Sequence, residues 1–207
     1  MSLRADSAET RGLLDQVEAG NREALDQLLG QHRGDLRDFI EVRLDPRLAA
    51  RVDPSDVVQE ALLTVTKRID DYLRRRPMPF RLWLRKTAYE RLLDLRRHHQ
   101  KHQRRSVARE EVWPERSSLL LARPLLARGG SPSDQLAARE LEERIGRAVA
   151  QLAEMDREVL LLRHGEDLPF EEIGCLLDIE PAAARKRFGR ALIRLQTVFA
   201  EYGVMES

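Results

Sequence analysis

The sequence of 207 residues has a single cysteine, few aromatic residues and no long hydrophobic run. Cys175 has no second cysteine with which to form an internal disulfide, which favours a reducing compartment. No apolar run exceeds four residues, whereas a membrane-spanning helix needs about 20, so we expect no transmembrane segment. The N-terminal MSLRADSAETR is charged where a secretory signal would be apolar. We therefore expect a cytoplasmic protein.

β-branched residues are also scarce. Valine, isoleucine and threonine together number 23, while leucine, alanine, arginine and glutamate are abundant. The first group favours strands and the second favours helices. The composition therefore predicts an all-α fold, and the length allows one domain or two small ones.

The 36 basic and 35 acidic residues nearly cancel in number but are unevenly placed. The net charge is +11 over residues 74–109 and +3 over residues 181–207, against −5 over 1–73 and −8 over 110–180. Basic blocks of this kind indicate a polyanionic partner such as nucleic acid. Solvated arginine-rich faces would give the same pattern, so charge alone leaves both interpretations open.

Residues 10–100 are predicted to form a first helical domain. Asp53 followed by Pro54 is typical of a helix start, with an N-cap and a proline at the first helical position. Apolar residues then recur on one face, which should pack inward: Val57, Ala61, Val65 and Ile69. Three polar residues remain on the outer face: Asp56, Gln59 and Glu60. They would suit a basic helical partner, although an ordinary solvated helix face is the simpler interpretation of these residues alone.

A second basic helix is predicted to begin at Phe80, after Pro77 and Pro79. Its cations would neutralise nucleic-acid phosphates, and its aromatic rings could stack on unpaired bases, worth about 1–3 kcal/mol each. The candidate contacts are Trp83, Arg85, Lys86, Tyr89, Arg91, Arg96 and Arg97. However, Phe80 and Trp83 also fit the apolar stripe that continues through Leu84, Ala88, Leu92 and Leu95, and so favour the core.

The periodicity is lost over residues 101–130, where prolines and a Gly-Gly pair predict a flexible linker. Residues 131–200 are predicted to form a second helical domain, which Ser131-Pro132-Ser133-Asp134 would cap at its start. Its first apolar stripe runs through Leu141, Ile145, Val149 and Leu152. Another helix is expected to start after Asp156.

The second domain ends in a pattern typical of a helix-turn-helix over residues 168–197. The first helix would run from Phe170 to about Asp178 and bury three residues: Ile173, Leu176 and Leu177. After a short turn, Pro181 would begin a second helix that buries Ala184, Phe188, Leu192, Leu195 and Phe199. We expect Cys175 to be a structural residue of the first helix rather than a reactive thiol.

The outer face of this second helix is basic, and no acidic residue occurs from 181 to 200. Small residues at its start would allow close approach to a major groove, where arginine binds guanine or phosphate. The candidate contacts are Ala182, Ala183, Arg185, Lys186, Arg187 and Arg190. We expect Arg187 and Arg190 to act partly as phosphate clamps.

Catalytic and metal-binding functions have little support in the sequence. His98 and His102 could share a helix face, but no carboxylate or thiol completes a metal site with them. The chain lacks a glycine-rich phosphate loop and a serine-elbow motif. We expect no cofactor and no metal.

Three segments, in this order, resemble the extracytoplasmic-function (ECF) group of bacterial RNA polymerase sigma factors. DPSDVVQEALLTVTKRID (53–70) is similar to the family's helix that docks on the polymerase clamp. FRLWLRKTAYERLLDLRR (80–97) is similar to the segment that opens and reads the −10 element. Residues 131–197 resemble the second domain, whose helix-turn-helix reads the −35 element.

The resemblance implies a protein without catalysis of its own that directs promoter-specific initiation. The implied partners are core RNA polymerase, through the clamp and flap of its large subunits, promoter DNA and, as regulator, an anti-sigma protein; no membrane is involved. Two departures from the family pattern stand out: Glu90 replaces a common asparagine, and Ala183-Ala184 replaces a common Thr-Val pair. The first affects which base is read, and the second removes a hydroxyl that could reach DNA.

Two other functions remain open from the residues alone. A stand-alone helix-turn-helix regulator would bind operator DNA without docking on polymerase. An all-helical adaptor would use its basic faces to bind acidic proteins. Of the three interpretations, only the sigma factor would support promoter-specific initiation together with core polymerase.

Overall fold

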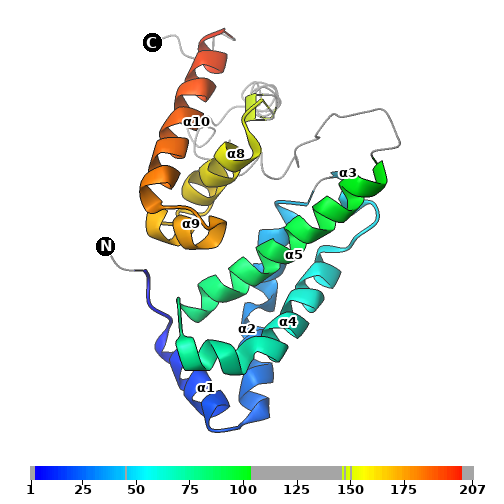
Figure 1. Ribbon diagram of the computed structural model, residues 1–207, viewed down its shortest axis with the longest axis vertical. Coiled ribbons are helices and arrows are strands. Elements are labelled where there is room, and N and C mark those ends of the chain that lie inside the picture. Colours follow the sequence, from blue (N-terminus) through cyan, green and yellow to red (C-terminus); the bar gives the residue numbers. More distant parts are fainter. Residues whose placement is uncertain (1–2, 45, 104–145, 147, 150, 202–207) are drawn as a thin grey trace, which may run out of the picture. The chain divides into compact units, whose positions relative to one another are not determined.

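The computed structural model describes residues 3–44, 46–103, 146, 148–149 and 151–201, and all regular structure in these ranges is helical (Figure 1). The prediction of an all-α fold is confirmed. The chain divides into two compact units, one built mainly from residues 1–109 and the other mainly from residues 110–207. Within the described ranges, no helix has both the length and the hydropathy needed to span a bilayer.

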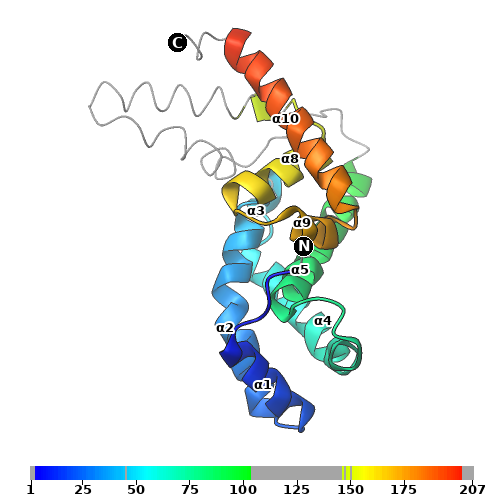
Figure 2. The same ribbon diagram turned by 90° about the vertical axis from the view of Figure 1, so that its left-hand side faces the viewer.

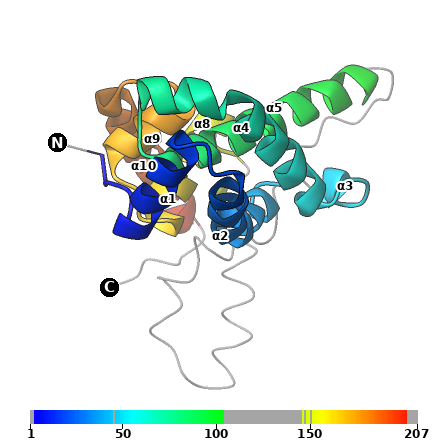
Figure 3. The ribbon, with the colours of Figure 1, turned by 90° about the horizontal axis from the view of Figure 1, so that it is seen from below.

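The first unit contains α1 (Ala8–Glu18), α2 (Arg22–Glu41), the short α3 (Pro46–Ala49), α4 (Pro54–Arg75) and α5 (Phe80–Gln103). Helices α2, α4 and α5 pack against one another, and α1 packs on α2 and α4 (Figure 3). The predicted inner face of α4 is buried throughout, at Val57, Ala61, Val65 and Ile69. The stripe on α5 is buried from Phe80 to Leu92 and half-buried at Leu95.

Side-chain caps set where the helices of this unit begin. The Asn21 side chain accepts hydrogen bonds from the backbone N–H groups of Glu23 and Ala24 at the start of α2. Asp53 caps α4 by accepting from the backbone N–H of Ser55 at 2.7 Å, and Pro54 follows at the first helical position, as predicted. This hydrogen bond holds the pKa of the Asp53 carboxyl below its ordinary value.

The start of α5 is capped by a residue of the N-terminal segment, which precedes α1. The Asp6 carboxylate accepts hydrogen bonds from the backbone N–H groups of Phe80, at 2.7 Å, and Arg81, at 3.3 Å. Proline residues precede Phe80, and the residue that would cap the helix locally, Pro79, has no polar side chain. The N-terminal segment therefore satisfies donors that the helix itself leaves open.

The C-terminal part of the chain contains α8 (Glu154–Leu160), a π-helical turn η1 (Leu161–Gly165), α9 (Phe170–Leu177) and the long α10 (Pro181–Glu201). Figure 2 shows α10 extending past the shorter α8. The prediction that a helix starts after Asp156 is wrong, because α8 begins at Glu154 with Ala153 as N-cap. Of the predicted first stripe, Val149 and Leu152 are buried, while Leu141 and Ile145 lie outside the described residues, as do the Ser131 cap and nearly all of the predicted linker.

Candidate nucleic-acid interface

Helices α9 and α10 form the predicted helix-turn-helix, and a tight turn joins them. Asp178, directly after α9, has a left-handed φ of 57°, and the backbone N–H of Ile179 donates to the Gly174 carbonyl at 3.0 Å. A Cβ atom on Gly174 would lie 2.7 Å from the Ile179 carbonyl oxygen. Glycine at 174 therefore lets the turn fold back closely onto α9.

The inner face of α10 packs on α9 and α8. Ala184, Ala191 and Leu195 are buried, and the Phe188 ring meets Phe170 of α9 edge-on at a centroid distance of 5.7 Å. Leu192, predicted to be buried, is 37% exposed. Leu192 is exposed because the buried face passes through Ala191, one residue earlier, and neighbouring positions on a helix point about 100° apart. The side chain of Phe199 lies outside the described residues.

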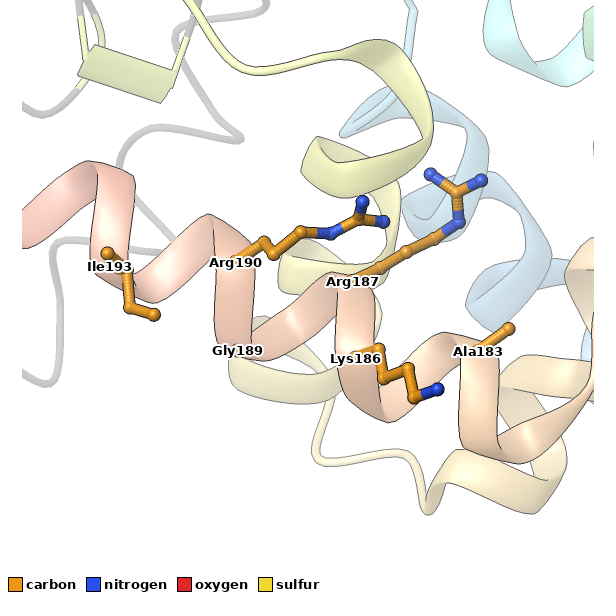
Figure 4. A pocket seen from close by; sticks show the side chains of 6 residues that line it. All are labelled: Ala183, Lys186, Arg187, Gly189, Arg190 and Ile193. Atoms are coloured by element: carbon orange, nitrogen blue, oxygen red, sulfur yellow. The ribbon is translucent and has the colours of Figure 1, made fainter.

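The outer face of α10 carries most of the predicted DNA contacts. Ala182, Arg185, Lys186 and Arg190 are exposed, and Ala183 is half-buried. A shallow, open hollow runs along this helix (Figure 4) and is lined by Ala183, Lys186, Arg187, Gly189, Arg190 and Ile193. The side chains of Ala182 and Ala183 are short and protrude little from the start of the helix, so its backbone can approach a surface closely.

Arg187 differs from the other cations of α10 because it is held by an acid of α8. Its guanidinium donates to the Asp156 carboxylate at 2.9 Å, and Arg190 lies 3.9 Å from the same oxygen. Asp156 is 4% exposed. The sequence gives no sign of this pair, because the two partners are 31 positions apart and no local pattern links them.

Arg185 also has an intramolecular neighbour. Its guanidinium lies 5.1 Å from the centre of the Phe170 ring, and that of Arg163 lies 5.4 Å from the same ring. Cation–π contacts at exposed sites are worth about 0.5–1 kcal/mol. This contact orients Arg185 but leaves its side chain exposed.

The aromatic candidates on α5 are buried. Trp83 is 9% exposed and stacks on Tyr72 of α4 at a centroid distance of 4.5 Å; Tyr89 is 5% exposed and meets Phe39 of α2 edge-on at 6.4 Å. Burial also raises the pKa of the Tyr72 hydroxyl, which donates to the Met78 carbonyl. Neither ring presents an open face on which an unpaired base could stack in this structure.

The cations of α5 are largely engaged within the unit. Arg91 donates to Glu60 of α4 and lies 3.9 Å from Asp94. Arg97 donates to Asp94 at 2.6 Å, and Arg96 donates to the backbone carbonyl of Arg43.

Two further cations of α5 are half-buried, Arg85 and Lys86. The Arg85 guanidinium lies 5.6 Å from the centre of the Phe39 ring. The block with a net charge of +11 therefore presents less unpaired charge on α5 than its composition suggests.

The predicted polymerase-binding face of α4 is exposed, as expected, at Asp56, Gln59 and Glu60. Leu63, one turn further along, is 61% exposed and adds an apolar side chain to the same face. The ion pair between Glu60 and Arg91 joins this face to α5. The structure thus connects two predicted sites that are separate in the sequence.

No group of three or more potential metal ligands occurs within the described ranges. His98 lies on α5 and is exposed, and the side chain of His102 lies outside the described residues. Cys175 is a free, half-buried thiol on α9.

Two family models match this chain, in the order of its two units. Sigma-70 region 2 matches residues 31–102, which contain α4 and α5. Sigma-70, region 4 matches residues 142–195, which contain α8, α9 and most of α10. Together the two matches include every predicted site residue.

Curated relatives align over almost the whole chain. The ECF RNA polymerase sigma-E factor of Haemophilus influenzae is 22% identical over 187 residues, covering 90% of this chain and 93% of the relative. The ECF RNA polymerase sigma factor ShbA of Streptomyces griseus is 28% identical over 200 residues, covering 95% and 91%.

A solved structure of CnrH in complex with the cytosolic domain of CnrY has a similar fold. Its TM-score is 0.58 at 23% sequence identity, and the match covers 94% of this chain and 99% of that chain.

A helical unit followed by a helix-turn-helix whose last helix has a basic outer face is typical of a DNA-binding protein. The two region matches and the full-length relatives make the assignment narrower. The chain belongs to the sigma-70 family of RNA polymerase sigma factors and, within it, to the ECF group. It is a sigma factor that directs transcription initiation.

Proposed function

We propose that this sigma factor selects promoters through two separate elements, with α10 binding the −35 element and α5 meeting the −10 element while α4 docks on core polymerase. The observation that carries the proposal is the exposed basic face of α10 within a matched region 4. A chain with one DNA-binding face and no docking face would instead support the stand-alone regulator.

The role of α10 rests on three exposed cations, Arg185, Lys186 and Arg190, beside the small residues Ala182 and Ala183. A helix with this outline can lie in a major groove, where its first turns reach base edges and its cations neutralise phosphates. Ala183 and Ala184 carry no hydroxyl, so the cations take a larger share of the contact.

The role of α5 is backbone neutralisation rather than base stacking by Trp83 and Tyr89, because both rings are buried. Arg97 remains 68% exposed despite its ion pair with Asp94. Exposed ion pairs are weak, worth about 0–1 kcal/mol, so a phosphate can replace the carboxylate at little cost. Arg91 and Arg96 would have to give up contacts to Glu60 and to the Arg43 carbonyl.

The docking face consists of Asp56, Gln59 and Glu60, with Leu63 beside them. An acidic face with one apolar side chain fits a basic helical surface such as the polymerase clamp. The flap would hold the second domain.

The proposed domains span residues 10–100 and 131–200, with 101–130 as linker. Two weak DNA-binding modules gain avidity when polymerase holds them at the spacing of the two elements. The free chain should then bind promoter DNA poorly. Polymerase supplies the chemistry, so no catalytic step is assigned to this chain, and we place the protein in the cytoplasm with polymerase.

CnrH was solved with the cytosolic domain of CnrY. By analogy, we propose that an anti-sigma protein regulates this sigma factor by binding to it directly. The anti-sigma protein would then compete with core polymerase for the sigma factor.

Transcription from genomic fragments tests the proposal. Core polymerase is incubated with the fragments with and without the purified chain, and RNA 5′ ends are sequenced. We expect chain-dependent start sites that share two sequence elements at a constant spacing. If no start site depends on the chain while it binds duplex DNA tightly by itself, the stand-alone regulator is the correct function.

A further inference from the structure

Asp156 lies on α8 beneath the DNA-facing helix α10. Its Oδ1 atom is 2.9 Å from the guanidinium of Arg187 and 3.9 Å from that of Arg190. The Asp156 side chain is 6% exposed, whereas the Arg187 and Arg190 side chains are 33% and 59% exposed. One buried carboxylate therefore faces two cations that line the hollow on α10.

The burial of Asp156 constrains Arg187 more than Arg190. A buried carboxylate that loses its partner is strongly destabilising, because it keeps its desolvation cost without the compensating attraction. If Arg187 turned to a DNA phosphate, Asp156 would lose its closest cation, and Arg190 is at the limit of ion-pair distance. Arg187 should therefore stay on Asp156 when DNA binds.

Lys186 is the sequence neighbour of Arg187, but the two side chains point in different directions. Figure 4 shows the side chains of Arg187 and Arg190 turned to the same side of α10, while Lys186 is turned to the other side. Lys186 is exposed. Two adjacent cations of one helix thus differ in how much of their charge is available to an anion.

We propose that Asp156 is a positioning residue that neutralises Arg187 and fixes it to α8, so that phosphate contact falls to Lys186 and its exposed neighbours. The inference rests on the proposed binding of DNA by α10. It replaces the expectation that Arg187 is a phosphate clamp. The pair also limits non-specific attraction to DNA, because Arg187 adds no net charge to the face.

The salt dependence of DNA binding measures this directly. Log K falls as log salt concentration rises, and each phosphate contact adds about 0.9 to the magnitude of this slope, which is the quantity compared between variants. The full-length chain is titrated onto a duplex of random sequence in a sodium chloride series. For Lys186→Gln we expect the slope to fall by about 0.9. For the charge-conserving double variant Asp156→Asn/Arg187→Gln we expect no change in slope.

Asp156→Asn alone should release Arg187 and raise the slope by about 0.9, with tighter binding to random DNA at low salt. A role limited to packing would weaken binding without steepening the slope. Thermal unfolding of each variant reports on folding. If Asp156→Asn does not fold, the slopes of Lys186→Gln and of the double variant still show whether Arg187 contacts phosphate.

Two failures are distinguishable. A double variant whose slope falls as much as that of Lys186→Gln shows that Arg187 contacts phosphate and overturns the inference alone. A Lys186→Gln variant with the slope of the unmodified chain overturns the role of Lys186; if Arg185→Gln and Arg190→Gln also keep that slope, α10 does not bind DNA and the proposed function fails as well.

Discussion

Gly174 shows at the residue scale how little space the helix-turn-helix turn allows. A Cβ atom there would lie 2.7 Å from the Ile179 carbonyl and 3.3 Å from the Pro181 nitrogen, both backbone atoms that cannot move independently. Gly189, in the middle of α10, has no atom of the described part of the chain within 4 Å of the same position. The two glycines therefore respond oppositely to the same substitution.

We expect Gly174→Ala to destabilise the second unit by about 1–3 kcal/mol through overpacking. Gly189→Ala should stabilise it by roughly 0.5–1 kcal/mol, because alanine is the better helix former. Thermal unfolding followed by circular dichroism measures both. Equal effects of the two substitutions would contradict the close approach at Gly174.

His32 on α2 makes the stability of the first unit depend on pH. Its ring lies 5.9 Å from that of Phe80, and its buried Nε2 atom has no hydrogen-bond partner among the described residues. Burial lowers its pKa from the ordinary value of 6.5. Of the charges facing it, two carboxylates raise the pKa and two arginines lower it: Asp35, Asp6, Arg85 and Arg81.

Because the folded state binds this proton less readily than the unfolded state, the contribution of His32 to stability is complete above pH 6.5 and is lost as the pH falls toward its folded pKa. We expect the free energy of unfolding to decline over this range. His32→Gln should make the decline shallower, measured by denaturant unfolding at a series of pH values. The exposed His164 provides the control, since His164→Gln should leave the decline in place.

At the scale of elements, α5 depends on a residue far from it in sequence. The Asp6 carboxylate caps two backbone donors of α5, which are 74 and 75 residues away in the sequence. The segment before α1 therefore fixes where the proposed −10 helix begins. A truncation of this segment would affect α5 although it removes no residue of α5.

Asp6→Ala should destabilise the first unit by about 0.5–2 kcal/mol, the usual cost of losing a helix N-cap. Amide hydrogen exchange at the start of α5 should increase in the same variant. As a control, Asp26→Ala removes an exposed carboxylate of α2 and should change stability by less than about 0.5 kcal/mol. Unchanged exchange at Phe80 and Arg81 in Asp6→Ala would refute the cap.

At the scale of the whole molecule, docking and DNA binding are proposed to use different faces, so they should be separable by mutation. Asp56 suits the test better than Glu60, because Glu60 also pairs with Arg91 of α5. Changing Glu60 would disturb both functions at once.

Asp56→Lys should weaken binding to core polymerase by about tenfold or more, since like charges placed across an interface cost several kcal/mol. Binding of the free chain to duplex DNA should not weaken. Fluorescence anisotropy with labelled chain measures both affinities, and Asp26→Lys is the charge-matched control on α2. A variant that keeps full polymerase affinity would exclude Asp56 from the docking face.

The sequence alone determined the helical fold, the start of α4 at Asp53-Pro54, its buried face and the helix-turn-helix. These follow from local signals, namely caps, helical periodicity and turn residues, which act within a few positions of one another. The exposed face of Asp56, Gln59 and Glu60 follows from the same period. The sequence misplaced Leu192, because both it and Ala191 are apolar and only packing selects between them.

Only the tertiary structure decided which charges are available for partners. The cap of α5 by Asp6, the pair of Glu60 with Arg91 and the pair of Asp156 with Arg187 join residues 31 or more positions apart, where no sequence period operates. The burial of Trp83 on Tyr72 is likewise a matter of how α4 and α5 meet. The sequence counts charges and rings, but only their neighbours in space determine which of them can still bind a partner.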